Sequence, residues 1–96
     1  MLVLVTYDVA TSDDGGKQRL RRVARLCVDH GQRVQLSVFE CLLEPAQWVK
    51  LRAALLNEID PEKDSLRFYF LGANWKHRVE HSGAKPAYDP EGTMLI

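Results

Sequence analysis

The apolar residues between positions 32 and 43 move from one face of a strand to the other partway along the segment. Val34, Leu36 and Val38 occupy even-numbered positions, but beyond Val38 the apolar residues Phe39, Cys41 and Leu43 occupy odd-numbered positions, and Glu40 is polar. Because side chains alternate with a period of two along a strand, an uninterrupted strand cannot make this change. The segment therefore predicts two short strands, or one sharply broken strand, with the break near Ser37.

Helical and strand patterns flank this segment. Residues 17–30 carry apolar side chains at helical spacing, and the second predicted helix begins at Glu44-Pro45, ends at Asp60-Pro61 and has an apolar face made of Trp48, Leu51, Leu55, Leu56 and Ile59. Residues 65–71 alternate as a strand does. Residues 2–9 are apolar on both faces, which is typical of a central strand. The order strand, helix, two strands, helix, strand predicts a ferredoxin-like α+β sandwich, with both helices on one face of an antiparallel sheet.

The length of 96 residues indicates a single domain, with a C-terminal extension from about residue 77. A core of this size is close to the lower limit for independent stability, so we expect a homodimer. The chain ends in the apolar segment 93–96, and we expect this segment to pair as a strand with a sheet edge of the partner chain.

Basic residues are concentrated in one part of the chain, although the formal net charge is zero. Between residues 17 and 33 there are six basic residues and one acidic residue, Asp29, and the six are Lys17, Arg19, Arg21, Arg22, Arg25 and Arg33. Zero net charge excludes a uniformly basic nucleic-acid binder, but this segment can contact phosphates without reading bases. The alternative is an ordinary solvated helix face.

The remaining composition indicates a cytoplasmic protein. Cys27 and Cys41 each lie among apolar neighbours, which favours reduced thiols in the core over a disulfide. The apolar run at residues 2–9 is too short to span a membrane, and it lacks the flanks of a signal peptide.

Several motifs resemble the CRISPR-associated protein 2 family. They are Tyr7-Asp8-Val9 at the end of the first predicted strand, GQRVQLSVFEC at 31–41, DSLRFY at 64–69 and DPEG at 89–92 with the Leu95-Ile96 end. The resemblance covers essentially the whole chain. It implies a ferredoxin-like homodimer whose first-strand aspartates face one another across the two-fold axis. Family members are described as metal-dependent endonucleases that act on RNA or on duplex DNA. They also form the central bridge of the complex that inserts new spacers, held between dimers of the CRISPR-associated integrase.

The resemblance also implies which residues matter for activity, and these are Tyr7, Asp8, Arg19, Arg22, Arg33 and Phe39. Tyr7 and Asp8 are the expected catalytic residues, and Asp8 is the expected Mg²⁺ ligand. Two such carboxylates brought together by symmetry can hold Mg²⁺ with water and a phosphate oxygen. Without the resemblance, an aspartate at the end of a strand is more often a turn residue, and Phe39 is by default a core residue.

Three functions fit these observations. The first is a metal-dependent phosphodiesterase with Asp8 as the metal ligand and the arginines as contacts to the backbone of the nucleic acid. The second is a non-catalytic dimeric scaffold that holds duplex DNA for the integrase. The third is a ferredoxin-like regulatory domain that binds a small molecule, and the basic segment argues against it.

Overall fold

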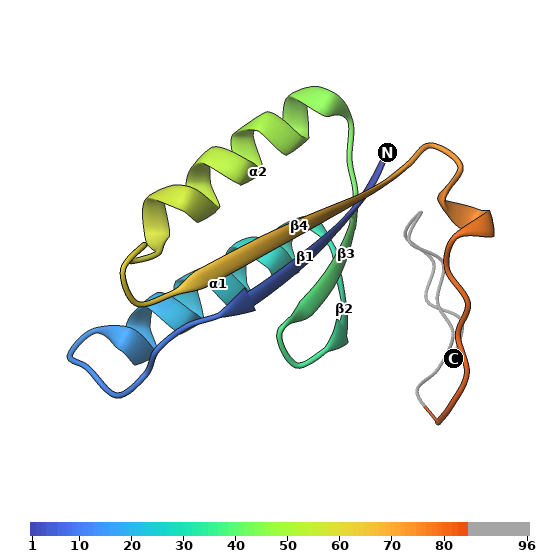
Figure 1. Cartoon of the computed structure of the whole chain (residues 1–96). Helices are drawn as coiled ribbons and strands as arrows, with labels where there is room; N and C mark the ends of the chain where they lie inside the picture. The colour runs from blue at the N-terminus through green and yellow to red at the C-terminus, as the bar shows by residue number, and fades with distance from the viewer. Residues whose placement is uncertain (85–96) are drawn as a thin grey trace.

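The elements follow one another in the order that the sequence predicts. The computed structural model describes residues 1–84, which contain β1 (Leu2–Asp8), α1 (Gly16–His30), β2 (Gln32–Gln35), β3 (Val38–Leu42), α2 (Pro45–Glu58), β4 (Ser65–Gly72) and the 3₁₀ helix η1 (Trp75–His77). The strands form one antiparallel sheet in the order β2-β3-β1-β4 (Figure 1). The ferredoxin-like prediction is confirmed, and β1 lies inside the sheet as expected.

The core lies between one face of this sheet and the two helices. Val3 and Val5 of β1 are fully buried and Tyr7 is 7% exposed. These residues belong to one apolar cluster with Val23 of α1 and Leu55 of α2. Because alternate residues of β1 meet both helices in one cluster, both helices pack on the same face of the sheet. The opposite face, which carries the side chains of residues 4, 6 and 8, is covered by neither helix.

The segment with inverted alternation forms the hairpin of β2 and β3. Leu36 and Ser37 make the turn, so the predicted break near Ser37 is confirmed as two strands. The register shifts between Arg33 and Gln35, with Arg33 opposite Phe39 and Gln35 opposite Val38. This bulge places Arg33 and Gln35 on opposite faces of the sheet, whereas simple alternation would place them on the same face.

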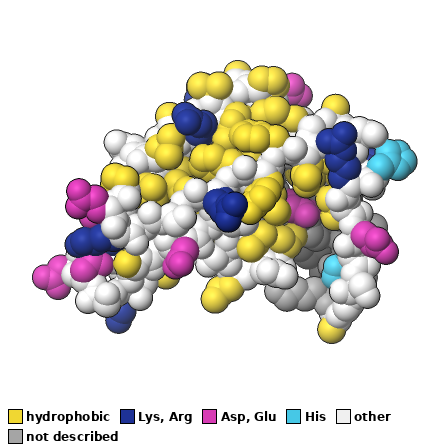
Figure 2. Space-filling view, in the orientation of Figure 1, with side chains coloured by type: hydrophobic (Ala, Val, Ile, Leu, Met, Phe, Trp, Pro, Cys, Tyr) yellow, Lys and Arg dark blue, Asp and Glu magenta, His cyan; other side chains and the backbone are white. Residues whose placement is uncertain are grey.

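Helix α2 begins where predicted, but its buried face contains fewer residues than the predicted apolar face. A capping box forms at its start, where the Glu44 amide donates to the Gln47 side chain at 2.8 Å. Within the predicted apolar face, Leu55 is fully buried, but Leu56 is 41% exposed, so its predicted burial is wrong. Figure 2 shows hydrophobic side chains gathered over α2 and β4, and the exposed ones include Phe70.

Two expectations concern the ends of the chain and the membrane. The predicted C-terminal strand at residues 93–96 lies outside the described residues. The predicted extension from about residue 77 begins where η1 ends. Within residues 1–84, no helix has both the length and the apolar character needed to cross a membrane.

Candidate functional site

Asp8 ends the central strand with its carboxylate open to solvent. It pairs with Ser65 of β4 in the register of the sheet, and its side chain lies on the face that the helices leave uncovered. Among residues 1–84, the Asp8 carboxylate has no hydrogen-bond or ion-pair partner. An exposed, unpartnered carboxylate held at the end of a central strand can bind a cation or a water molecule without first breaking an internal contact.

A single chain offers only part of a magnesium site. Carboxylate oxygens are the ligands that Mg²⁺ takes from proteins, and Asp8 supplies one such group. Within the described part of the chain, no group of three or more His, Cys, Asp or Glu residues is arranged to hold a metal ion. One chain therefore supplies only part of a Mg²⁺ site. A second carboxylate, water and a phosphate oxygen would have to complete it.

The loop that follows Asp8 is tied to a buried ion pair between Arg19 and Asp64. The Arg19 Nε donates to Asp64 Oδ2 at 2.8 Å, and the Asp64 side chain has no exposed surface. Burial acts to raise the pKa of Asp64, but hydrogen bonds from Arg19 and from two backbone amides outweigh it, so the pKa lies below its ordinary value. Hydrogen bonds to Asp64 and to Asp13 raise the pKa of Arg19. This pair holds its charges throughout the neutral range.

Asp13 extends this ion pair toward the surface. Arg19 Nη1 donates to Asp13 Oδ2 at 3.2 Å, and Lys63 Nζ donates to the same oxygen at 3.0 Å. Hydrogen bonds from Arg19 and Lys63 lower the pKa of Asp13 to about 2. Arg19 was expected to contact phosphate. Its side chain is instead 16% exposed, and its guanidinium pairs with two carboxylates. This geometry explains Arg19 by its ion pairs, and its contact with phosphate stays a prediction.

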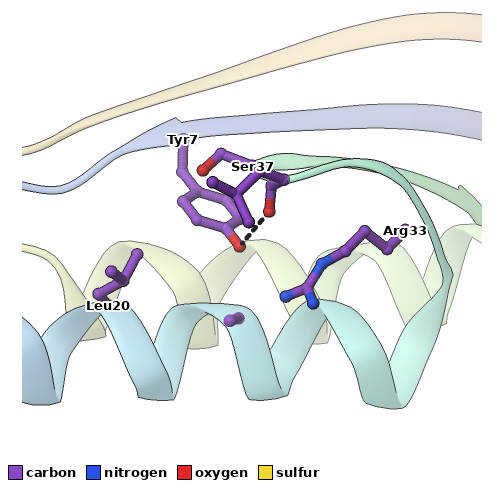
Figure 3. Close-up of a pocket in the computed structure, with 6 residues that line it drawn as sticks. Tyr7, Leu20, Arg33 and Ser37 are labelled. Atoms are coloured by element: carbon purple, nitrogen blue, oxygen red, sulfur yellow. Dashed lines mark hydrogen bonds between the residues drawn. The ribbon is translucent and has the colours of Figure 1, made fainter.

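Tyr7, Arg33 and Phe39 meet on the side of the sheet that faces the helices. The Tyr7 and Phe39 rings stack with centroids 6.2 Å apart, and the Arg33 guanidinium lies 4.9 Å from the centre of the fully buried Phe39 ring. The Tyr7 hydroxyl donates to the Leu36 carbonyl at 3.5 Å, which joins the central strand to the hairpin turn (Figure 3).

Tyr7 and Arg33 border a small pocket between α1 and the hairpin. Its volume is about 150 Å³, and its lining residues are Tyr7, Leu20, Ala24, Arg33, Leu36 and Ser37. In Figure 3 the Arg33 guanidinium reaches toward α1 on one side of the pocket, and Leu20 lies on the other. The lining is mostly apolar, and no carboxylate contributes to it.

The structure separates Tyr7 from Asp8. Consecutive residues of a strand point to opposite faces, so the Tyr7 ring packs under the helices while the Asp8 carboxylate points away from them. For both side chains to act on the same phosphodiester, that group would have to contact both faces of the sheet. The buried position of Tyr7 is explained by packing and by its bond to the turn.

Three basic residues of α1 form an exposed line, and one of them, Arg25, also has an acidic partner on the same helix. Lys17, Arg21 and Arg25 are exposed and lie four residues apart, so they follow one side of the helix. Arg25 Nε lies 3.3 Å from an oxygen of Asp29, and Arg22 Nη1 lies 4.0 Å from Glu58 of α2. The exposed line can contact phosphates with little rearrangement.

Sequence reasoning missed Asp64. It immediately precedes β4, and 45 positions separate it from Arg19. The only local hint is that Asp64 lies at the start of a conspicuous strand, where a turn residue is also expected. The N-cap residue of α1 is Gly15, and no side-chain hydrogen bond caps this end of the helix.

Comparisons with a family model, with known sequences and with solved structures all point to the same family. Residues 1–79 match the family model described as CRISPR associated protein Cas2. The chain is 65% identical over 96 residues to the CRISPR-associated endoribonuclease Cas2 of Nitratidesulfovibrio vulgaris, covering 100% of this chain and 94% of that protein. It is 66% identical over 96 residues to the protein of the same name from Chlorobaculum tepidum, covering all of both. The crystal structure of Streptococcus pyogenes Cas2 at pH 6.5 superposes with a TM-score of 0.74 at 58% identity, covering 86% of this chain and 100% of that one.

Proposed function

We infer the function from the premise that this chain belongs to the CRISPR-associated protein Cas2 family. We propose that it is a metal-dependent endoribonuclease of CRISPR-based defence, that it works as a homodimer, and that Asp8 lies at its reaction centre. The observation that carries this proposal is the exposed, unpartnered Asp8 carboxylate at the end of the central strand. The names of the relatives from N. vulgaris and C. tepidum support the choice of RNA as substrate.

The homodimer is proposed because one chain supplies only one carboxylate. The face of the sheet that carries Asp8 also carries Leu4 and Leu42, which are partly exposed, and Tyr69, which is 42% exposed. Packing this face against a second copy would remove apolar surface from water and bring two Asp8 side chains toward one another. Two carboxylates give the ligand set that Mg²⁺ requires from the protein.

The bound ion would supply charge neutralisation at the phosphodiester and a bound water of lowered pKa. The chain itself contributes the placement of the carboxylate and the contacts to the backbone of the nucleic acid. The proposed phosphate contacts are Lys17, Arg21 and Arg25 on the exposed line of α1, together with Arg22 of α1 and Arg33 of β2. Such contacts position the nucleic acid without selecting its sequence.

One observation favours a second function, a non-catalytic scaffold that holds duplex DNA for the CRISPR-associated integrase. Within residues 1–84, no acidic or histidine residue joins Asp8 to form a metal cluster, which a dedicated hydrolase would normally supply. A dimer with basic helices can hold DNA without any such cluster. In both proposed functions, the endoribonuclease and the scaffold, the protein takes part in spacer acquisition with the integrase.

Asp8→Asn tests the enzymatic function. The substitution keeps the shape of the side chain and removes the charge that holds Mg²⁺. It should abolish metal-stimulated cleavage of single-stranded RNA and leave the dimer and its affinity for nucleic acid unchanged. Asp14→Asn is the matched control, because Asp14 is an exposed carboxylate in the neighbouring loop. This control should cleave at the wild-type rate.

The same preparations separate the two functions. Cleavage by Asp8→Asn at the wild-type rate would show that Asp8 is not the reaction centre. If the wild-type protein cleaves neither RNA nor duplex DNA with Mg²⁺, the scaffold is favoured. Spacer insertion by the purified integrase should then depend on this protein and be unaffected by Asp8→Asn.

A further inference from the structure

Both backbone polar groups of Ala10 are held by the two members of one ion pair. The Ala10 amide donates to Asp64 Oδ1 at 3.0 Å, and the Ala10 carbonyl accepts from Arg19 Nη2 at 3.3 Å. Ala10 lies two residues after Asp8, in the loop between β1 and α1. The conformation of the chain directly after Asp8 is therefore fixed by two side chains that are remote in sequence.

The ion pair is itself held firmly. Asp64 also accepts a hydrogen bond from the Asp60 amide at 2.8 Å, and it directly precedes Ser65, the residue that pairs with Asp8 in the sheet. Arg19 lies near the start of α1. The pair therefore links the end of β1, the start of β4 and the start of α1 at one point beside Asp8.

The loop closes tightly around this point. A Cβ atom at Gly16 would clash with the Ala10 carbonyl oxygen, so only glycine allows the first turn of α1 to approach the loop this closely. With two glycines at residues 15 and 16, the loop has little local rigidity of its own. The contacts that fix the loop at Ala10 are those of Arg19 and Asp64.

We propose that Arg19 and Asp64 are positioning residues, which hold the Ala10 backbone and thereby fix where β1 ends and where the Asp8 carboxylate lies. This inference rests on the proposed function of Asp8. A carboxylate that shares an ion with its symmetry mate must be placed to within a fraction of an ångström. Asp8 itself has no side-chain contact that could supply this precision among the described residues, so the precision has to come from the backbone.

Asp64→Asn tests the proposal in the full-length protein. The amide keeps the size of the side chain and one acceptor oxygen but loses the charge that pairs with Arg19. Asp13→Asn is the matched control, because it removes a carboxylate from the same arginine without touching Ala10. Arg19→Lys is a second variant, which keeps the positive charge and loses the planar group that joins Asp64 to the Ala10 carbonyl.

The first measurement is independent of activity. Amide hydrogen exchange at Ala10 should become about tenfold faster or more in Asp64→Asn, and ¹⁵N relaxation at Asp8 should show increased motion, while exchange at Val5 in the core stays unchanged. The Asp13→Asn control should stay close to wild type. If Asp64→Asn fails to fold, Arg19→Lys supplies the same comparison. Unchanged exchange at Ala10 and unchanged order at Asp8 would overturn the proposal.

The second measurement separates positioning from stability. RNA cleavage is measured with Mg²⁺ at a temperature where every variant is folded. The kcat of Asp64→Asn should be about tenfold to a hundredfold below that of wild type, with KM nearly unchanged. Loss of Ala10 protection with a wild-type kcat would show that the pair serves only the fold. If the wild-type protein shows no cleavage, the proposed enzymatic function fails, while the exchange and relaxation data still decide whether the pair positions Asp8.

Discussion

Replacing Phe39 should separate its packing role from any direct role in activity. The ring is fully buried, stacks on Tyr7 and lies under the Arg33 guanidinium. Truncating a buried phenylalanine to alanine costs about 3–5 kcal/mol. Unfolding free energies of domains run from about 5 to 15 kcal/mol, and a core of this size places the chain near the lower end, so Phe39→Ala should lose most of its stability. Loss of activity in that variant would therefore say nothing about chemistry.

Phe39→Leu is the informative substitution. Leucine keeps most of the buried volume, so we expect a volume-related cost of less than about 1.5 kcal/mol. Losing the aromatic contact with Tyr7 adds about 0.5–1.5 kcal/mol, and losing the contact with the half-exposed Arg33 adds about 0.5–1 kcal/mol. The sum, about 1–4 kcal/mol, should appear as a lower urea midpoint with an unchanged denaturant slope.

The assay compares urea unfolding with RNA cleavage for the wild type, Phe39→Leu and Phe39→Ala. If Phe39 acts only through packing, Phe39→Leu should cleave RNA at nearly the wild-type rate wherever it is fully folded. A stably folded, dimeric Phe39→Leu protein that cleaves RNA at least about a hundredfold more slowly would refute this reasoning. The aromatic ring would then have a role in activity that its burial does not explain.

Two further predictions concern charge. Because the pKa of Asp13 is lowered to about 2 from its ordinary value of 3.8, the unfolded chain binds a proton at a higher pH than the folded one does. The stability that Asp13 contributes is thus present above about pH 4 and lost as the pH falls toward 2. The urea midpoint of Asp13→Asn should fall less steeply than that of wild type across this interval, and equal steepness would contradict the role of this carboxylate. If the exposed line on α1 binds phosphate, Arg21→Ala and Arg25→Ala should each reduce the slope of log affinity for duplex DNA against log salt by about 0.9. Unchanged slopes in filter-binding titrations would show that this face is only solvated.

The sequence alone determined the order of the elements and the place of the first strand. Apolar side chains on both faces of residues 2–9 predicted a central strand, and the structure places β1 between β3 and β4. The change of face after Val38 required a break, and the turn at Leu36-Ser37 supplies it. These features could be predicted because each depends on spacing within a few residues, where the geometry of a strand or helix is fixed in advance.

Only the tertiary structure decided which polar residues act together. Arg19 and Arg21 are both arginines of the same helix. Arg19 pairs with the buried side chain of Asp64, whereas Arg21 is exposed. The distinction depends on which side of α1 faces the start of β4, and that is set by how the helices pack on the sheet. Similarly, the family resemblance grouped Tyr7 with Asp8, whereas the packing of the helices covers one and leaves the other open. Contacts between residues 45 positions apart follow from packing across the whole sheet, and no local pattern encodes them.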